Sequence, residues 1–85
     1  MNVIEKYIAK QKAILRHTQS ITEMIKYLAD CKDNGELISE SDGQFTGGYY
    51  QELWKLDNCY YEFTLFDGSV DDLTIYDAEV YDGKK

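Results

Sequence analysis

The chain has 85 residues, of which 44% are hydrophobic and 14% aromatic, and its formal net charge is −7. One small domain fits this length, and the apolar content is too high for a disordered chain. The apolar runs are too short to span a bilayer, and MNVIEKYIAK lacks the apolar core of a signal peptide. We therefore expect a single cytoplasmic domain over residues 1–85, helical over 1–31, a β meander over 36–81 and a tail over 82–85.

The first segment, from residue 2 to about residue 31, has apolar residues at heptad a and d spacing. These residues are Ile4, Tyr7, Ile14, Ile21, Ile25 and Leu28, with Gln11 and Thr18 at the two remaining sites. Ser20-Ile-Thr-Glu23 has the pattern of a capping box, which favours two helices meeting near Thr18. The helical phase is kept from Ile14 to Met24, however, and this favours a single helix, which is our expectation.

Two roles are open for this apolar stripe. It covers one face of a sheet, which a small sheet needs for burial, or it forms a coiled-coil seam between two copies. We expect the first role. Asp33-Asn34-Gly35 should end the helix with a left-handed cap, and His17, with no second ligand at metal spacing, is read as a surface or partly buried imidazole.

Residues 36–48 are polar and contain several glycines. Leu37-Ile38-Ser39 predicts a short edge strand, Ser41-Asp42-Gly43 a turn, and Phe45 the start of another strand. Gly47-Gly48 predicts a bend that leads into the main sheet. No P-loop pattern accompanies these glycines.

Three segments rich in aromatic and β-branched residues follow, and they predict an antiparallel meander. The segments are Tyr49 to Leu56, Cys59 to Phe66 and Val70 to Tyr76. A two-residue turn at Asp57-Asn58 sets the first register, and a three-residue loop from Asp67 to Ser69 sets the second by pairing Phe63 with Leu73 and Tyr61 with Ile75. The fold class is α+β, with an N-terminal helix or helix pair packed on one face of a three- to five-stranded antiparallel sheet.

This register divides the sheet into two faces. The inner face, where the helix should pack, holds Tyr50, Trp54, Leu56, Cys59, Tyr61, Phe63, Leu65, Leu73 and Ile75. The opposite face holds Tyr49, Gln51, Leu53, Lys55, Tyr60, Glu62, Thr64, Phe66, Val70, Asp72, Thr74 and Tyr76.

Large aromatic residues and carboxylates alternate on the opposite face, which is typical of a protein interface. The candidate partner-binding residues are Tyr49, Tyr60, Glu62, Phe66, Asp71, Asp72, Tyr76, Asp77 and Glu79. Two alternatives remain for the aromatic residues: they only stabilise the sheet, or the tail from Ala78 to Tyr81 folds over them. The carboxylates in turn are either an array that imitates nucleic acid or a solubilising surface.

Charge is divided unevenly along the chain. Residues 1–35 hold six basic and four acidic residues, whereas residues 36–82 hold twelve acidic residues and one basic residue, Lys55. The acidic half would repel nucleic acid and acidic membranes and attract a basic protein. We expect no direct nucleic-acid or membrane binding.

No reaction is indicated by the residues. Asp71 and Asp72 point to opposite sides of a strand, so they could not share a substrate. Cys31 and Cys59 fall in apolar patterns that suggest burial. We therefore expect free thiols, no catalytic residues, no metal and no cofactor. A cation site at the acidic second loop lacks the full calcium-loop pattern.

In size, acidity, absence of proline and helix-then-sheet order, the chain resembles the small inhibitors that bacteriophages encode against host CRISPR or restriction systems. Several of those inhibitors mimic nucleic acid. The resemblance implies a non-enzymatic inhibitor of a basic, nucleic-acid-binding protein in the host cytoplasm, as a monomer or homodimer. The alternatives are an immunity or antitoxin-type protein that neutralises a toxin, and a homodimeric adaptor that assembles through the N-terminal helix.

Overall fold

The computed structural model describes residues 2–41 and 47–84. The elements in chain order are α1 (Val3–Lys12), β1 (Ile14–Thr18), α2 (Ile21–Asn34), β2 (Glu36–Ser41), β3 (Tyr49–Leu56), β4 (Cys59–Phe66), β5 (Ser69–Asp77) and α3 (Ala78–Tyr81). The strands form one five-stranded antiparallel sheet in the order β1-β5-β4-β3-β2, so the predicted α+β class is confirmed. Among these residues, no helix is both long and apolar enough to cross a membrane.

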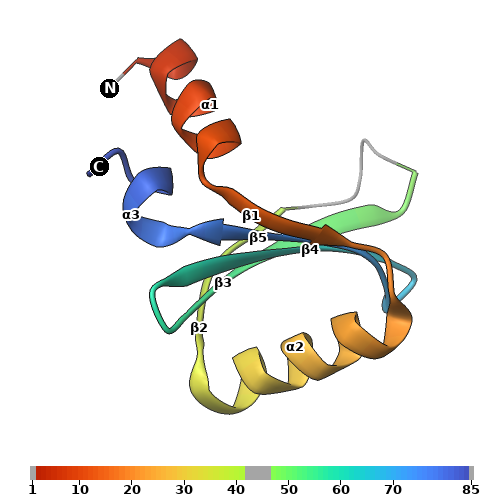
Figure 1. Ribbon diagram of the computed structural model, residues 1–85. Coiled ribbons are helices and arrows are strands. Elements are labelled where there is room, and N and C mark those ends of the chain that lie inside the picture. The colour runs from red at the N-terminus through yellow and green to blue at the C-terminus, as the bar shows by residue number, and fades with distance from the viewer. Residues whose placement is uncertain (1, 42–46, 85) are drawn as a thin grey trace.

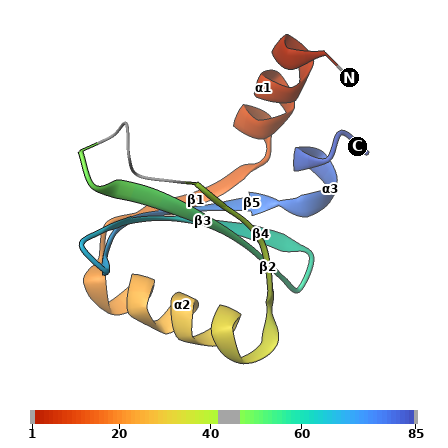
Figure 2. The same cartoon turned by 180° about the vertical axis from the view of Figure 1, so that it is seen from behind.

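Helices lie on both sides of the sheet (Figure 1 and Figure 2). We call the side covered by α2 the inner face and the side that carries α1 and α3 the outer face. Helices α1 and α3 come from opposite ends of the chain and pack against each other. Only part of the outer face is covered in this way, which leaves the rest open.

The expectation of a single N-terminal helix was wrong. Between the two helices the chain extends into β1, which pairs with β5 at the edge of the sheet. The Ser20 amide donates to Thr18 Oγ1 (3.0 Å), and the Ser20 hydroxyl accepts from the Glu23 amide (3.4 Å), so a second helix begins at Ser20, the alternative that the capping-box pattern favoured. Strand pairing along β5 overrode the helical phase of this segment, because propensity is weaker than tertiary context.

The expected role of the heptad stripe was also wrong for most of its residues. Leu28 packs on the core, but Ile4, Tyr7, Ile14, Ile21 and Ile25 are exposed. With β1 inserted, the stripe is not one continuous seam. The inner face is covered instead by α2, through Met24, Tyr27, Leu28 and Cys31.

The first hairpin has the predicted register, with Leu56 opposite Cys59. Asp57 (φ 51°) and Asn58 (φ 63°) both have left-handed backbones, as a two-residue type I′ turn requires. The second hairpin also turns on two residues, Asp67 and Gly68, so the three-residue loop was wrong.

The predicted pairs Phe63–Leu73 and Tyr61–Ile75 are nevertheless correct, because β5 contains a bulge at Asp71. The bulge supplies the extra residue that had been assigned to the loop. It also turns Val70 to the inner face, where it packs beside the core, although the alternation had placed it outside.

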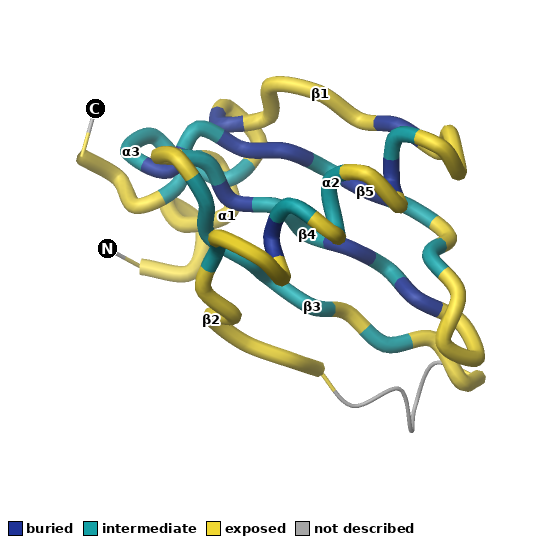
Figure 3. The backbone as a smooth tube through the Cα atoms, turned by 90° about the horizontal axis from the view of Figure 1, so that it is seen from below, coloured by how far each residue is buried: buried dark blue, intermediate teal, exposed yellow. Residues whose placement is uncertain are grey.

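The core lies between α2 and the two central strands. Phe63, Leu65, Leu73 and Ile75 are buried together with Met24 and Cys31, and the other residues predicted for the inner face pack around them. Figure 3 shows the buried stretches along β4 and β5, with β1 and β2 mainly exposed at the edges.

Gly35 ends α2 for a different reason than expected. Its backbone is extended (φ −97°), so no left-handed cap forms. A Cβ at this position would lie 2.8 Å from the Cys31 carbonyl oxygen and 3.0 Å from that of Lys55. Glycine is therefore required because α2, β2 and β3 approach closely here.

Both edge strands are irregular. The predicted edge strand at Leu37-Ile38-Ser39 is confirmed as part of β2, with a bulge at Ile38, and β1 has a bulge at Leu15. Gly47 (φ 70°) and Gly48 (φ 94°) form the predicted bend before β3. The turn predicted at Asp42-Gly43 and the strand start predicted at Phe45 lie outside the described residues.

Candidate functional site

The end of the outer face beneath α3 is a second, smaller core. Ala13, Tyr60, Tyr76 and Ala78 are buried there, and Leu53, Val80 and Tyr81 pack around them. Asp77 begins α3, since its Oδ1 accepts from the amides of Glu79 (2.9 Å) and Val80 (3.1 Å). The tail therefore folds over the sheet, and only 8% of Tyr60 and 3% of Tyr76 remain exposed.

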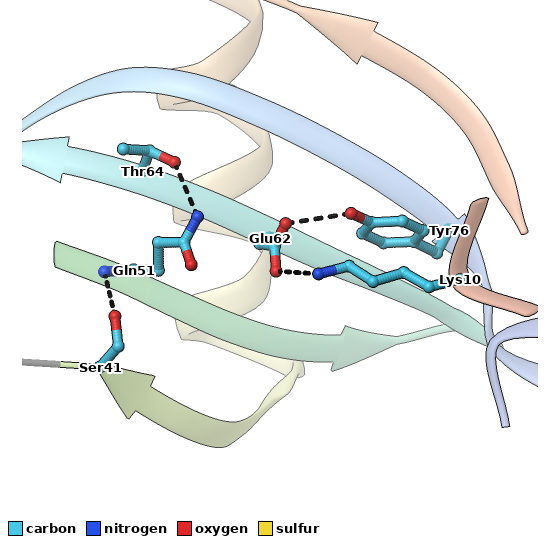
Figure 4. A network of polar contacts seen from close by, with 6 residues as sticks. All are labelled: Lys10, Ser41, Gln51, Glu62, Thr64 and Tyr76. Atoms are coloured by element: carbon cyan, nitrogen blue, oxygen red, sulfur yellow. Dashed lines mark hydrogen bonds and ion pairs between the residues drawn. The ribbon is translucent and has the colours of Figure 1, made fainter. Parts of the chain in front are cut away.

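A polar network joins α1 to this end of the sheet (Figure 4). Lys10 Nζ lies 3.1 Å from Glu62 Oε2, the Tyr76 hydroxyl donates to Glu62 Oε1 (3.0 Å), and Lys10 lies over the Tyr76 ring. Burial raises the pKa of Tyr76, and the charge and hydrogen bond of Glu62 raise it further. The phenol therefore remains a donor at neutral pH, and Glu62 is neutralised within the molecule.

The tail brings a second carboxylate to the phenols. The Tyr60 hydroxyl donates to both oxygens of Asp82, at 3.0 and 3.1 Å, and the rings of Tyr60 and Tyr81 have centroids 4.7 Å apart. Burial raises the pKa of Tyr60, and its hydrogen bond with Asp82 adds to the effect. Burial also raises the pKa of Tyr81, although nearby Lys10 lowers it. Tyr60, Tyr76 and Tyr81 therefore stabilise the fold at this end of the sheet.

The open part of the outer face is mainly neutral and polar. Gln51 donates from its side chain to Thr64 Oγ1 (3.3 Å), and its amide donates to the Ser41 hydroxyl (2.9 Å). Asp72 is hydrogen-bonded to His17 of β1. Of the two alternatives for the carboxylates, an array across this face is disfavoured, because Glu62 and Asp72 are hydrogen-bonded within the molecule.

An aromatic pair stands at the far end of the sheet, beside the second hairpin. Tyr49 and Phe66 face each other on β3 and β4, with ring centroids 4.7 Å apart, and are 40% and 45% exposed. Asp67, which follows Phe66 in the turn, and Asp71 in the bulge of β5 are also exposed. We call Tyr49, Phe66, Asp67 and Asp71 the aromatic tip.

The nine predicted site residues therefore do not form one surface. Tyr49, Phe66 and Asp71 lie at the tip, with Asp72 one residue further along β5. Tyr60, Glu62 and Tyr76 lie beneath α1 and α3, while Asp77 and Glu79 belong to the start of α3.

Lys10 and Asp82 were missed as partners of the outer-face residues. Their contacts join the two ends of the chain to the sheet, and strand alternation carries no information on them. The small residues Ala9 and Ala13, four apart on α1, are the one local signal that this side of the helix could lie close to another element.

Neither cysteine is prepared for nucleophilic chemistry. Burial, with the charge of Asp30, raises the pKa of Cys31 to about 12, and burial also raises the pKa of Cys59. Both are free thiols. In the described part of the chain, no three His, Cys, Asp or Glu side chains gather as a metal site requires. The aromatic and polar side chains of the outer face can stack and form hydrogen bonds, as those of a binding surface do.

Two hollows flank Tyr81. A cleft of about 410 Å³ lies between α1 and α3 and is lined by Lys6, Tyr7, Lys10, Tyr81 and Asp82. A smaller groove of about 130 Å³ is also lined by Tyr81, with Leu53 and Gln51 of β3 and Glu40 of β2 in its lining. Comparison with family models, curated proteins and solved structures found no match.

Proposed function

We propose that the protein is a non-enzymatic, acidic binding protein that inhibits a basic, nucleic-acid-binding protein. One observation carries this proposal. Glu36, Glu40, Asp57, Asp67 and Asp71 are exposed, and within the described part of the chain they form no ion pair. Their negative charge is therefore available to attract a partner of opposite charge.

Asp67 and Asp71 belong to the aromatic tip, which is the part of the molecule best suited to contact. Phe66 and Tyr49 supply apolar area at low conformational cost, and Asp67 and Asp71 supply charge beside it. Aromatic anchors with a charged rim are typical of binding hot spots. The protein acts by occupying the partner's nucleic-acid site, without binding nucleic acid itself.

The test is capture of a basic protein from host lysate at low and high salt, followed by competition with that protein's own DNA or RNA. Binding should weaken steeply with salt, and nucleic acid should displace the inhibitor. Binding that is independent of salt, or that leaves nucleic acid bound, contradicts the proposal.

Two turn residues give a matched pair of variants for locating the contact. Asp67 (φ 50°) and Asp57 (φ 51°) occupy equivalent positions in turns at opposite ends of the sheet. Asn tolerates the same backbone, so Asp67→Asn and Asp57→Asn each remove one charge and preserve the turn. Asp67→Asn and Phe66→Ala should weaken capture more than Asp57→Asn, which removes one charge away from the aromatic tip.

A further inference from the structure

Helix α1 leaves its apolar residues largely exposed, although Tyr7 also lines the cleft beside α3. Val3, Ile4, Tyr7 and Ile8 are 83%, 70%, 64% and 45% exposed, and α1 buries no residue. They follow i, i+1, i+4, i+5 spacing and so form one stripe along the helix. We call these four residues the α1 stripe.

The side of α1 that does pack is small or polar. Ala9 and Lys10 are half-buried, Lys10 reaches Glu62, and Ala13 just after the helix is 1% exposed. A ten-residue helix is marginal in water without tertiary packing on its apolar side. Here that side has no cover within the described chain, so a further surface is needed to stabilise it.

Charge indicates what kind of surface fits. Helix α1 carries Lys6, Lys10 and Lys12 against Glu5, whereas residues 36–82 are strongly acidic. A basic protein of the kind proposed above would repel α1. The complement to α1 is an acidic surface with apolar residues in it, and this chain carries one.

That surface is the groove beside Tyr81 on the outer face. Most of its lining is polar, but Leu53 and Tyr81 give it apolar atoms, and Glu40 gives it an exposed carboxylate. Tyr81 also lines the cleft against α1, so the groove and α1 are neighbours. Two copies related by a two-fold axis can therefore exchange contacts, each α1 stripe meeting the groove of the other copy.

We infer that the α1 stripe is a self-association surface, occupied by the groove of a second copy of this chain. Tyr7 and Ile8 cover Leu53 and Tyr81 of the partner subunit, and Lys12 faces Glu40 of the partner subunit. This contact uses Glu40 but not the aromatic tip, so variants at Asp67 and Phe66 test the proposed function separately from it. A helix about 15 Å long buries a small area, so the dimer is weak and reversible.

The first test is sedimentation equilibrium of the full chain between roughly 1 μM and 1 mM. The mass should rise reversibly from that of one 9.9 kDa chain towards twice that value. A single-chain mass over the whole range overturns the inference.

Ile4→Asp and Ile21→Asp are a matched pair for this test. Both residues lie in the first turn of a helix, and they are 70% and 64% exposed, so neither substitution removes core packing. Ile4→Asp should raise the dissociation constant by about tenfold or more, whereas Ile21→Asp should leave it unchanged. Equal effects of the two substitutions contradict the assignment of the stripe.

A charge exchange tests the groove itself. Lys12→Glu and Glu40→Lys should each weaken the dimer about threefold or more, and the double variant should recover most of the loss. Lys26→Glu on α2 is the control for net charge and should not be rescued by Glu40→Lys. Additive losses in the double variant would place Lys12 away from Glu40 and refute the groove as the contact.

The remaining candidate for the stripe is a lipid surface, and it gives a distinct result. Vesicles of anionic phospholipid, mixed with the protein in a flotation assay, should not bind it, because the body of the chain is acidic. Flotation that Ile4→Asp abolishes, with a monomer in solution, would replace the second copy by a membrane.

Discussion

At the scale of single residues, the tyrosines divide into two roles that composition does not separate. Tyr60 and Tyr76 are buried hydrogen-bond donors to carboxylates, while Tyr49 is 40% exposed and stacks on Phe66. The difference arises from α3, which covers only one end of the outer face. Phenols beneath α3 stabilise the fold, whereas the Tyr49 ring beyond it stays partly exposed.

Removing the Tyr76 hydroxyl tests how much the polar network between α1 and the sheet contributes to stability. Tyr76→Phe should lower the free energy of unfolding by about 1 to 2 kcal/mol, because Glu62 loses a buried donor. Tyr7→Phe, at a residue that is 64% exposed, is the control and should change it by less than about 0.5 kcal/mol. Urea unfolding monitored by circular dichroism gives both values, and equal changes would show that the hydroxyl contributes nothing specific.

The buried thiol predicts how stability depends on alkaline pH. Cys31 is 0% exposed and its pKa is raised to about 12, whereas a thiol in the unfolded chain ionises near pH 8.5. The folded state therefore holds a proton that the unfolded state releases, so this stability is complete below about pH 8 and is lost as the pH rises towards 12. Tyr61, whose pKa burial raises to about 12, acts in the same direction.

The urea midpoint is measured at pH 7, 9 and 10, because the ordinary pKa values of cysteine and tyrosine are about 8.5 and 10. The midpoint should fall with each step. Iodoacetamide at pH 8 should modify Cys31 only after unfolding, with partly buried Cys59 reacting first. A midpoint that stays constant to pH 10 would contradict the protection of these groups.

At the scale of elements, the junction between α2 and β2 is the most constrained connection. Gly35→Ala would place a Cβ 2.8 Å from a backbone oxygen that cannot move away without disturbing α2. We expect a loss of about 1 to 3 kcal/mol in unfolding free energy. Gly47→Ala is the contrast, since a Cβ there meets nothing within 4 Å and the cost comes only from its φ of 70°. Thermal unfolding of both variants separates a steric cost from a conformational one.

Elements whose form depends on local pattern could be predicted, and those that depend on distant contacts could not. Two-residue alternation located Phe63, Leu73 and Ile75 on the inner face, and Asp57-Asn58 located the first turn. Residues 14–18 became a strand only because β5 offers them an edge. The bulge at Asp71 likewise keeps Phe63 paired with Leu73, and the residues of the turn do not predict it.

The candidate site was less predictable than the fold for the same reason. Tyr49, Phe66 and Asp71 are exposed at one end of the sheet, and their role as contact residues stays a prediction. Tyr60 and Tyr76 have the same alternation in sequence but lie beneath α3, because the tail returns over the strands. Spacing along one strand predicts which face a residue occupies, but not what covers that face.

At the scale of the whole molecule, net charge should make stability depend on salt. The exposed acids repel one another, and the ion pair of Glu62 with Lys10 neutralises only part of the excess. Raising the salt from about 0.01 M to about 0.15 M shortens the screening length from about 30 Å to about 8 Å. The urea midpoint should therefore rise with NaCl, and a fall would show that attractive pairs dominate.

The two bulged edge strands have a consequence for how the protein behaves when it is concentrated. Leu15 in β1 and Ile38 in β2 interrupt the regular row of backbone donors and acceptors that an incoming strand would need. Sheet growth from molecule to molecule is therefore blocked at both ends of the strand order. Concentrated samples should remain free of fibrils that bind thioflavin, even though both edges contain aliphatic residues.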